Sequence, residues 1–498
     1  MMSCYARTKE LPVCNSNVGI NAEGLNYYSA GMPYYDLAKM AMGWIRPWHS
    51  SWEKTPLDLD ENGYLKVIDE GGTQTIIHDD EWGRSLKDSK YVLLYDGEGD
   101  IEFNLSKPRI ISKKPGRIEV ELTKGRLGMS QKSTKKDNPL RNIRFVPASK
   151  ENSYQSTIVR DEYINLWKGI SVIRYLNQQT TNNSKEVNWQ DRKKLNSFGT
   201  VDSTSLEDII QTANETNTNP WLLAPHLAND DYFKNMAIYV KDHLKPNLKV
   251  YLEYTNEAWN GSFQQAKYLA EIAKKNNTSQ HFEYGKRSLE LFKIWEEVFG
   301  GANRLVRIIS TQLVNPQVTE QIFTVPELAS HTDGLAVGYY FGYELGTAGM
   351  VDKTLTMSED EVLHYLESES IPKTKAFAEQ QQKLAKKYNL ELMAYEAGQH
   401  LVGAGWTQKL GLLTDNKKLA EKFINVNRNV KMKELYLAFY KNWQEIGGGL
   451  LVWFQATGKA SRWGSWGLLE NMGDIAKKSP KYQAFQLIMS KTACASNK

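Results

Sequence analysis

The feature that most constrains the fold is an alternation of two kinds of segment from about residue 160 onward. Apolar strand-like runs are predicted at 171–177, 220–226, 249–257, 304–312, 334–341, 390–398 and 449–455. Amphipathic helices are predicted between them at 204–217, 230–243, 262–275, 282–298, 360–388 and 416–446. Strands that are apolar on both faces are typical of a parallel sheet covered by helices. With an eighth apolar run at 18–22, the pattern favours a (β/α)8 TIM barrel over an open doubly wound sheet.

A second pattern separates the first barrel strand from the others. Residues 64–68, 73–77, 91–95, 100–105, 117–122 and 141–146 form short runs of alternating apolar and polar residues, with turn residues between them. Period two is typical of antiparallel strands with one covered face. We therefore expect the first barrel strand and a helix at 35–44 within residues 1–52, an inserted antiparallel β-sandwich-like domain at 53–150, and the remainder of the barrel at 151–498.

Charge and cysteine content exclude several classes of protein. The 62 basic and 58 acidic residues nearly balance at +4, and the basic group Lys132, Lys135 and Lys136 is interpreted as a solvated loop, so no nucleic-acid partner is expected. No apolar run approaches the roughly 20 residues of a membrane span. The three cysteines lie near the termini without the spacing of zinc ligands, so we expect no metal and no cofactor. A disulfide between Cys4 and Cys14 and free thiols, including Cys494, both stay open.

The start of the chain bears on where the protein resides. Its first residues, Met-Met-Ser-Cys-Tyr-Ala-Arg, lack the apolar core of a signal peptide. We expect a secreted or extracytoplasmic protein whose signal peptide is absent from this sequence, with the cytoplasm as the alternative. A monomer is expected.

Two carboxylates end strands of the predicted barrel. The fourth strand ends in Thr255-Asn256-Glu257 and the seventh in Tyr395-Glu396. A single glutamate at such a position is usually half of a structural ion pair, but the C-terminal ends of the strands form the active site in TIM barrels. Glycoside hydrolysis needs one protonated and one ionised carboxyl group. The pair therefore indicates a glycosidase, with Asn256 placed to bind a sugar hydroxyl.

These motifs resemble the large clan of retaining (β/α)8 glycoside hydrolases that includes cellulases, mannanases, xylanases and β-galactosidases. In that clan an Asn-Glu pair ends the fourth strand and a second glutamate ends the seventh, which Asn256-Glu257 and Glu396 match. The resemblance covers about two-thirds of the chain. It implies that Glu257 is the acid/base and Glu396 the nucleophile.

The resemblance also implies roles for other substrate-binding residues. Arg174 on the second strand would bond to the nucleophile, and His226 follows the third strand. Tyr339 or Tyr340 would face the centre of the barrel, and we favour Tyr339 because it shares its parity with Leu335 and Val337. Trp453, at the end of the eighth strand, would form a platform under the reacting sugar. Structural roles in the core are the alternative for each of these residues.

Aromatic residues on the predicted loops could stack on sugars, because loops carry specificity on a rigid barrel. The candidates are Trp259, Trp406, Trp463 and Trp466, with Tyr27, Tyr28, Trp44 and Trp48 on the first loop. Gln455 and Lys459 are candidates for contacts with sugar hydroxyls or an acidic sugar.

We therefore expect an endo-acting retaining glycoside hydrolase that takes a β-linked polysaccharide or oligosaccharide as its partner. The first alternative is a non-catalytic carbohydrate-binding barrel, and the second is a barrel enzyme of other chemistry, such as a lyase. The carboxyl separation distinguishes the mechanisms, since about 5–5.5 Å is typical of retention and about 6.5–9.5 Å of inversion.

Overall fold

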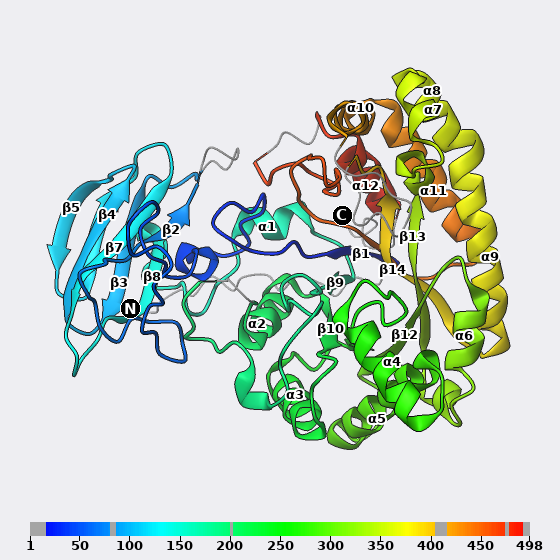
Figure 1. Cartoon of the computed structure of the whole chain (residues 1–498), viewed down its shortest axis with the longest axis horizontal. Helices are drawn as coiled ribbons and strands as arrows, with labels where there is room; N and C mark the ends of the chain where they lie inside the picture. The colour runs from blue at the N-terminus through cyan, green and yellow to red at the C-terminus, as the bar shows by residue number, and fades with distance from the viewer. Residues whose placement is uncertain (1–15, 80–85, 200–202, 404–415, 474–477, 492–498) are drawn as a thin grey trace, which may run out of the picture.

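A computed structural model describes residues 16–79, 86–199, 203–403, 416–473 and 478–491. Eight parallel strands form a closed barrel in the order β1-β15-β14-β13-β12-β11-β10-β9 (Figure 1). The strands are β1 (Val18–Asn21), β9 (Val172–Arg174), β10 (Asn219–Ala224), β11 (Val250–Tyr254), β12 (Leu305–Thr311), β13 (Gly334–Phe341), β14 (Glu391–Gln399) and β15 (Leu451–Trp453). The predicted (β/α)8 barrel is confirmed.

Helices surround the barrel (Figure 1). They are α1 (Asp161–Leu166), α2 (Leu206–Thr216), α3 (Asp230–His243), α4 (Gln264–Asn276), α5 (Gln280–Phe299), α6 (Pro316–Ile322), α7 (Val351–Thr356), α8 (Glu359–Tyr365), α9 (Ile371–Lys387), α10 (Lys417–Arg428), α11 (Lys431–Glu445) and α12 (Pro480–Ser490). None of the helices in these described ranges is long and apolar enough to span a membrane.

Two antiparallel sheets lie between β1 and β9 in the chain and to one side of the barrel (Figure 1). One sheet has the order β2-β7-β4 and the other β5-β6-β3-β8. Their strands are β2 (Thr75–His78), β3 (Lys90–Asp96), β4 (Gly99–Leu105), β5 (Arg109–Lys114), β6 (Arg117–Glu121), β7 (Leu127–Thr134) and β8 (Arg141–Pro147). Phe103 of β4 packs against Phe145 of β8 with ring centroids 6.0 Å apart, so an apolar core joins the two sheets.

Several predicted elements differ from the structure. The helix expected at 35–44 is a single 3-10 turn, Leu37–Met40, and no extended strand forms at 64–68. Strands β5 and β7 were not predicted, because β5 is exposed along most of its length and the second half of β7 is polar, so neither shows a clear alternation of apolar and polar residues. Lys132 lies on β7 and pairs with Glu102 at 3.0 Å, so interpreting it as part of a loop is wrong.

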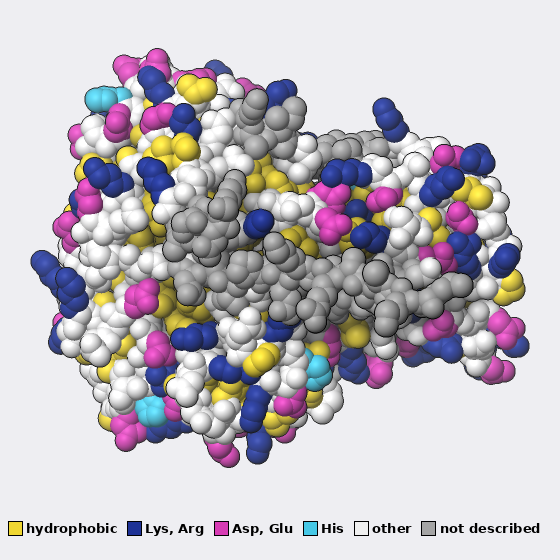
Figure 2. Space-filling view, turned by 180° about the vertical axis from the view of Figure 1, so that it is seen from behind, with side chains coloured by type: hydrophobic (Ala, Val, Ile, Leu, Met, Phe, Trp, Pro, Cys, Tyr) yellow, Lys and Arg dark blue, Asp and Glu magenta, His cyan; other side chains and the backbone are white. Residues whose placement is uncertain are grey.

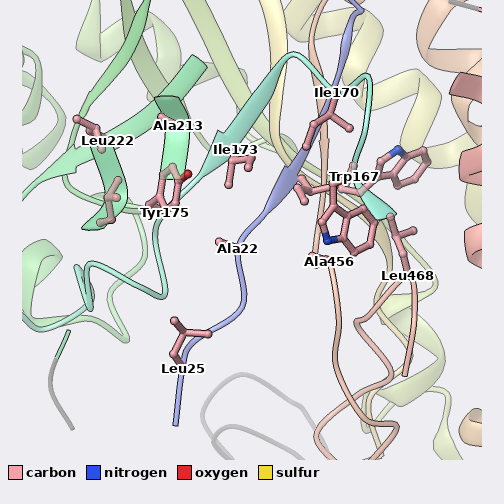
Figure 3. Close-up of a cluster of buried hydrophobic side chains, with 14 of the residues drawn as sticks. Ala22, Leu25, Trp167, Ile170, Ile173, Tyr175, Ala213, Leu222, Ala456 and Leu468 are labelled. Carbon is pink, nitrogen blue, oxygen red and sulfur yellow. The ribbon is translucent and has the colours of Figure 1, made fainter. Parts of the chain in front are cut away.

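The barrel strands have apolar side chains on both faces, and these form two separate clusters. The inner cluster includes Trp221, Met393 and Tyr395, while the larger outer cluster fills the space between strands and helices. Figure 3 shows part of the outer cluster, with Ile173 and Tyr175 near Leu222 of β10.

Charged side chains are spread over the surface. On the face shown in Figure 2, Lys and Arg side chains are interspersed with Asp and Glu, and neither sign dominates a wide area.

Candidate active site

Glu257 lies just beyond β11, where the backbone changes direction sharply. Thr255 and Glu257 have φ values of 50° and 40°, which non-glycine residues adopt rarely and at a cost of about 1–3 kcal/mol each. The Oε1 atom of Glu257 accepts a hydrogen bond from the Tyr395 hydroxyl at 3.0 Å. Its Oε2 atom accepts one from Asn260 Nδ2 at 2.9 Å. Both donors are neutral, and they fix the orientation of a half-buried carboxyl group.

Glu396 reaches the interior of the barrel through a bulge in β14. The register pairs Val337 with Ala394 and then Gly338 with Glu396, so Tyr395 is the extra residue. A bulge of this kind lets two consecutive side chains point the same way. Tyr395 belongs to the inner cluster, and Glu396 also faces inward. A Cβ atom on Gly338 would lie 3.1 Å from the Tyr395 hydroxyl, so glycine leaves room for this ring.

Arg174, at the end of β9, links two other predicted site residues. Its fully buried guanidinium donates from Nη1 to Glu396 Oε1 at 2.9 Å and from Nη2 to Asn256 Oδ1 at 2.8 Å. The group lies between the rings of Trp221 and Tyr395, at 5.5 and 4.9 Å from their centroids. The structure therefore brings Arg174, Asn256 and Glu396 together.

Asn21, at the end of β1, was not predicted as a site residue. Its Nδ2 atom donates to the Tyr395 carbonyl oxygen at 2.9 Å, and its Oδ1 atom accepts from Arg174 at 3.3 Å. Asn182 was also missed, and it accepts from Asn256 Nδ2 at 3.0 Å. In a single sequence, nothing distinguishes an asparagine with such a role from any other asparagine on a loop or at a strand end.

Tyr340, rather than Tyr339, contacts the predicted nucleophile. The Tyr340 hydroxyl donates to Glu396 Oε2 at 2.9 Å. Tyr339 instead stacks on Phe439 of α11 with centroids 4.2 Å apart. The prediction that Tyr339 faces the centre is wrong because Leu335 and Val337, whose parity it shares, belong to the outer cluster. Apolar residues on both faces of a parallel strand hide which face is the inner one.

Burial and the unequal set of donors govern the ionisation of the two glutamates. Burial raises the pKa of Glu396, while Arg174 and Tyr340 oppose that rise and the nearby Glu257 adds to it. Burial also raises the pKa of Glu257, against the hydrogen bonds from Asn260 and Tyr395. Among the described residues a cation donates to Glu396 and neutral groups donate to Glu257, and this difference favours the negative charge on Glu396 over Glu257.

His226 follows β10 and packs toward the helices. Its ring lies edge-on to Tyr268 of α4 at 5.6 Å, and its carbonyl oxygen accepts from the Tyr254 hydroxyl at 2.8 Å. Burial lowers the pKa of His226 to about 4, so its imidazole is neutral at physiological pH. Among the described residues, its hydrogen bonds and ring contacts do not include either glutamate.

Trp453 does not form the predicted platform. Its side chain is 1% exposed and stacks on Tyr436 of α11 with centroids 5.1 Å apart, so it faces the helices. Trp466 lies nearer the glutamates, since its ring is 5.9 Å from that of Tyr340 and 4.9 Å from that of His400. The sequence does not reveal which of Trp453 and Trp466 lies nearer the glutamates, because the inner and outer faces of β15 are both apolar.

The remaining aromatic candidates are divided between surface and core. Trp463 and Tyr28 are 46% and 45% exposed, and Trp48 is 38% exposed. Trp259 is half-buried against the outer cluster, and Tyr27 packs edge-on against Tyr28. Trp44 is buried and stacks on Phe198, so it is a core residue. Trp406 and the three cysteines lie outside the described residues.

Two polar candidates follow β15. Gln455 Oε1 accepts from Asn177 Nδ2 at 3.3 Å, and Lys459 is exposed. The Gln455 bond joins the loop after β15 to the loop after β9.

The structure also contains a third carboxylate that sequence reasoning missed. Glu253 of β11 is fully buried and accepts hydrogen bonds from Arg174 and from Trp221 Nε1. Its signal in the sequence is an acidic residue within an apolar strand, four positions before Glu257.

The architecture can be compared with solved structures. The GH51 arabinofuranosidase from Xanthomonas axonopodis pv. citri is 12% identical over 61% of this chain and 61% of that chain, with a TM-score of 0.35. The GH5-4 broad specificity endoglucanase from Bacteroides salanitronis is 11% identical over 67% of this chain and 85% of that chain, with a TM-score of 0.43. A modular endo-beta-1,4-mannanase from Cellulomonas fimi is 10% identical over 68% and 69% of the two chains, with a TM-score of 0.36.

No family model and no curated protein matches the sequence. At identities of 10–12% the likeness to these structures concerns the fold alone. The closed parallel barrel and the two glutamates at its strand ends stand on their own geometry.

Proposed function

We propose that the protein is a retaining glycoside hydrolase that cleaves a β-linked polysaccharide at internal bonds. The observation that carries the proposal is the linkage of the two glutamates. Tyr395 donates to Glu257, and Arg174 and Tyr340 donate to the adjacent Glu396. Two carboxyl groups from different strands therefore share one site and have different partners, which is the arrangement that acid-assisted displacement at a sugar requires.

In the first step, Glu396 attacks the anomeric carbon, and the bond from that carbon to the leaving oxygen breaks. Glu257 gives its proton to that oxygen, so the departing sugar leaves as an alcohol. In the second step, Glu257 takes a proton from water, the resulting hydroxide oxygen bonds to the anomeric carbon, and Glu396 is released as a carboxylate. Arg174 and Tyr340 hold the carboxylate of Glu396 in place for both steps.

The proposal of a polymeric substrate is supported by aromatic residues along the loops. Trp466 and His400 line the side of the site near Tyr340, and the exposed Tyr343 ring lies 6.4 Å from His400. Flat apolar faces of this kind stack on sugar rings. Tyr343 after β13 and Trp463 after β15 are both exposed, and two such rings on different loops favour several bound sugars over one.

The test is the release of reducing sugar from a panel of β-linked plant and algal polysaccharides. Wild type should release oligosaccharides, and Glu396→Gln should not. Glu391→Gln is the matched control, since this exposed glutamate begins the same strand β14 at its opposite end. Retention is read from the anomer that forms first, by proton NMR. Product of inverted configuration would contradict the double displacement.

The second candidate function is glycan binding without turnover. It would be favoured if wild type bound a polysaccharide with measurable affinity but released no sugar from it over long incubation. The intact donor set around both glutamates favours catalysis, because a binding protein has no need of a buried nucleophile.

A further inference from the structure

Glu253 lies deeper in the barrel than the two glutamates assigned to catalysis. Its side chain is fully buried, so it cannot touch a bound sugar. Its Oε2 atom accepts from Arg174 Nη2 at 3.0 Å, from Arg174 Nε at 3.2 Å and from Trp221 Nε1 at 2.9 Å. In the part of the chain that the structure describes, its Oε1 atom has no hydrogen-bond partner. Such a costly arrangement calls for a function.

The donors of Arg174 explain what Glu253 does. The Nε and Nη2 atoms on one edge of the guanidinium bond to Glu253, while Nη1 bonds to Glu396. Because the guanidinium is planar and rigid, fixing one edge also fixes the direction in which Nη1 points. The orientation of the donor to Glu396 therefore depends on a carboxylate on the far side of Arg174.

Charge is the second contribution of Glu253. Arg174 keeps its positive charge even when fully buried. That charge is shared between Glu253 and Glu396, with N–O distances of 3.0 and 2.9 Å. An arginine that faced Glu396 alone would stabilise the anion of Glu396 more strongly and make it a weaker nucleophile.

We propose that Glu253 is a positioning residue of the active site, which orients Arg174 toward Glu396 and neutralises part of its charge. This inference rests on the proposed function, because it assigns Glu396 as the nucleophile. In the described chain, the charged and titratable groups around Glu396 are Arg174 of β9, Tyr340 of β13, Tyr395 of β14, Glu257 after β11 and Glu253 itself. Among these charged and titratable groups, Glu253 and Glu396 are the two that accept hydrogen bonds from the guanidinium.

The first experiment replaces Glu253 by glutamine, which keeps the shape and one acceptor oxygen but removes the charge. The pKa of Glu396 should then fall, so the acidic limb of kcat/KM should move to lower pH by about one unit. The pH-independent rate should fall by about 100-fold, because Arg174 is held less firmly. Both effects are measured on an aryl glycoside across pH 4 to 9, the range in which carboxyl groups with raised pKa titrate.

The matched control is Asp208→Asn. Asp208 of α2 is also buried and ion-paired, with Lys39 at 2.8 Å, but it lies outside the barrel. This variant should lose stability while keeping the pH profile of wild type. A loss of stability alone in Glu253→Gln, with an unchanged acidic limb, would show that Glu253 is only structural and overturn the proposal.

A second variant tests the same inference if Glu253→Gln does not fold. Glu253→Asp keeps the charge but withdraws it from Arg174 by one methylene. It should shift the acidic limb in the same direction by a smaller amount and lower the rate about 10-fold. A wild-type limb and a wild-type rate in Glu253→Asp would contradict the inference.

A measurement independent of turnover separates this inference from the proposed function. The titration of Glu396 can be followed by carboxyl ¹³C NMR, with its signal assigned by its loss in Glu396→Gln. If wild type cleaves no sugar, the proposed function fails. The Glu396 titration should still move to lower pH in Glu253→Gln, and an unmoved titration would refute the coupling through Arg174.

Discussion

Glu257 follows β11 on a segment whose backbone has positive φ, whereas Glu396 lies within β14, where an extra residue turns it inward. Glu257 is half-buried and, among the residues that the structure describes, receives hydrogen bonds from the neutral Asn260 and Tyr395. Glu396 is 7% exposed and receives them from the cation Arg174 and from Tyr340. The same residue type at corresponding ends of two strands thus meets two environments, and this difference is the basis of the two roles proposed for them.

The largest loss of activity is expected when each of the two glutamates is replaced in turn. Glu396→Ala should lose activity on every substrate by about 10⁴-fold or more, because no other group can attack the sugar. Glu257→Ala should lose activity on polysaccharide to a similar degree. It should still form a glycosyl-enzyme rapidly from an aryl glycoside with a good leaving group, since such a group needs no proton.

Azide sharpens this test. It should restore turnover of the aryl glycoside in Glu257→Ala by attacking the glycosyl-enzyme, and it should give a β-glycosyl azide detectable by NMR. If Glu396→Ala instead showed burst kinetics and formed the azide product, Glu257 would be the nucleophile and Glu396 the acid/base.

The neighbouring tyrosines of β13 give the next largest effect. Tyr340→Phe removes a hydrogen bond that lowers the pKa of Glu396, so that pKa should rise and the acidic limb of kcat/KM should move to higher pH. The rate should fall by about 10-fold, which is equivalent to one hydrogen bond to a charged group. Tyr339→Phe is the matched control, and kcat/KM is measured as a function of pH for both variants. An equal effect of the two substitutions would contradict the assignment of Tyr340 to the site.

A smaller effect is expected at Tyr395, which donates to Glu257. The hydroxyl of Tyr395 lowers the pKa of Glu257, so Tyr395→Phe should raise it. The basic limb of kcat/KM, which follows loss of the Glu257 proton, should then move to higher pH, and the rate should change only about threefold. Movement of the acidic limb alone would mean that Tyr395 acts on Glu396 instead.

The smallest effect is expected from a change next to the bulge in β14. A Cβ on Gly338 would press on the Tyr395 hydroxyl, so Gly338→Ala should cost about 1 kcal/mol of unfolding free energy and lower kcat a few-fold. Gly349→Ala is the control, because a Cβ there meets no atom within 4 Å. Thermal unfolding and initial rates measure the two effects. Equal stability of the variants would show that the bulge has room to relax.

Strand order and strand ends could be predicted from the sequence, because apolar runs separated by helices specify a barrel and place Glu257 and Glu396 at its rim. The predicted range for β13 matches the structure at 334–341. The direction of individual side chains could not be predicted. Tyr339 and Trp453 face helices. Their direction could not be predicted because the outer and inner faces of the strands are equally apolar.

Other parts of the molecule carried too weak a signal. The bulge at Tyr395 inserts one residue, and nothing in Met-Ala-Tyr-Glu-Ala-Gly marks it. Strands β5 and β7 form through backbone pairing with β6 and β4, so their polar side chains did not reveal them. Glu253 was visible as an acidic residue in an apolar strand, but its partner Arg174 is 79 positions away in the chain.

The position of β1 has a consequence for the order of folding. This strand pairs with β9 on one side, where Gly19 lies beside Val172, and with β15 on the other, where Val18 lies beside Leu451. The entropy of closing a loop grows only slowly with its length, by about 0.6 kcal/mol per doubling, so the long excursion is tolerated at equilibrium. During synthesis on the ribosome, however, β1 emerges before the other barrel strands, and its second partner exists only after Leu451 of β15 has been made. Asn21, which bonds to both Arg174 and Tyr395, arrives with that strand. The candidate active site is therefore completed only when β1 and β15 pair.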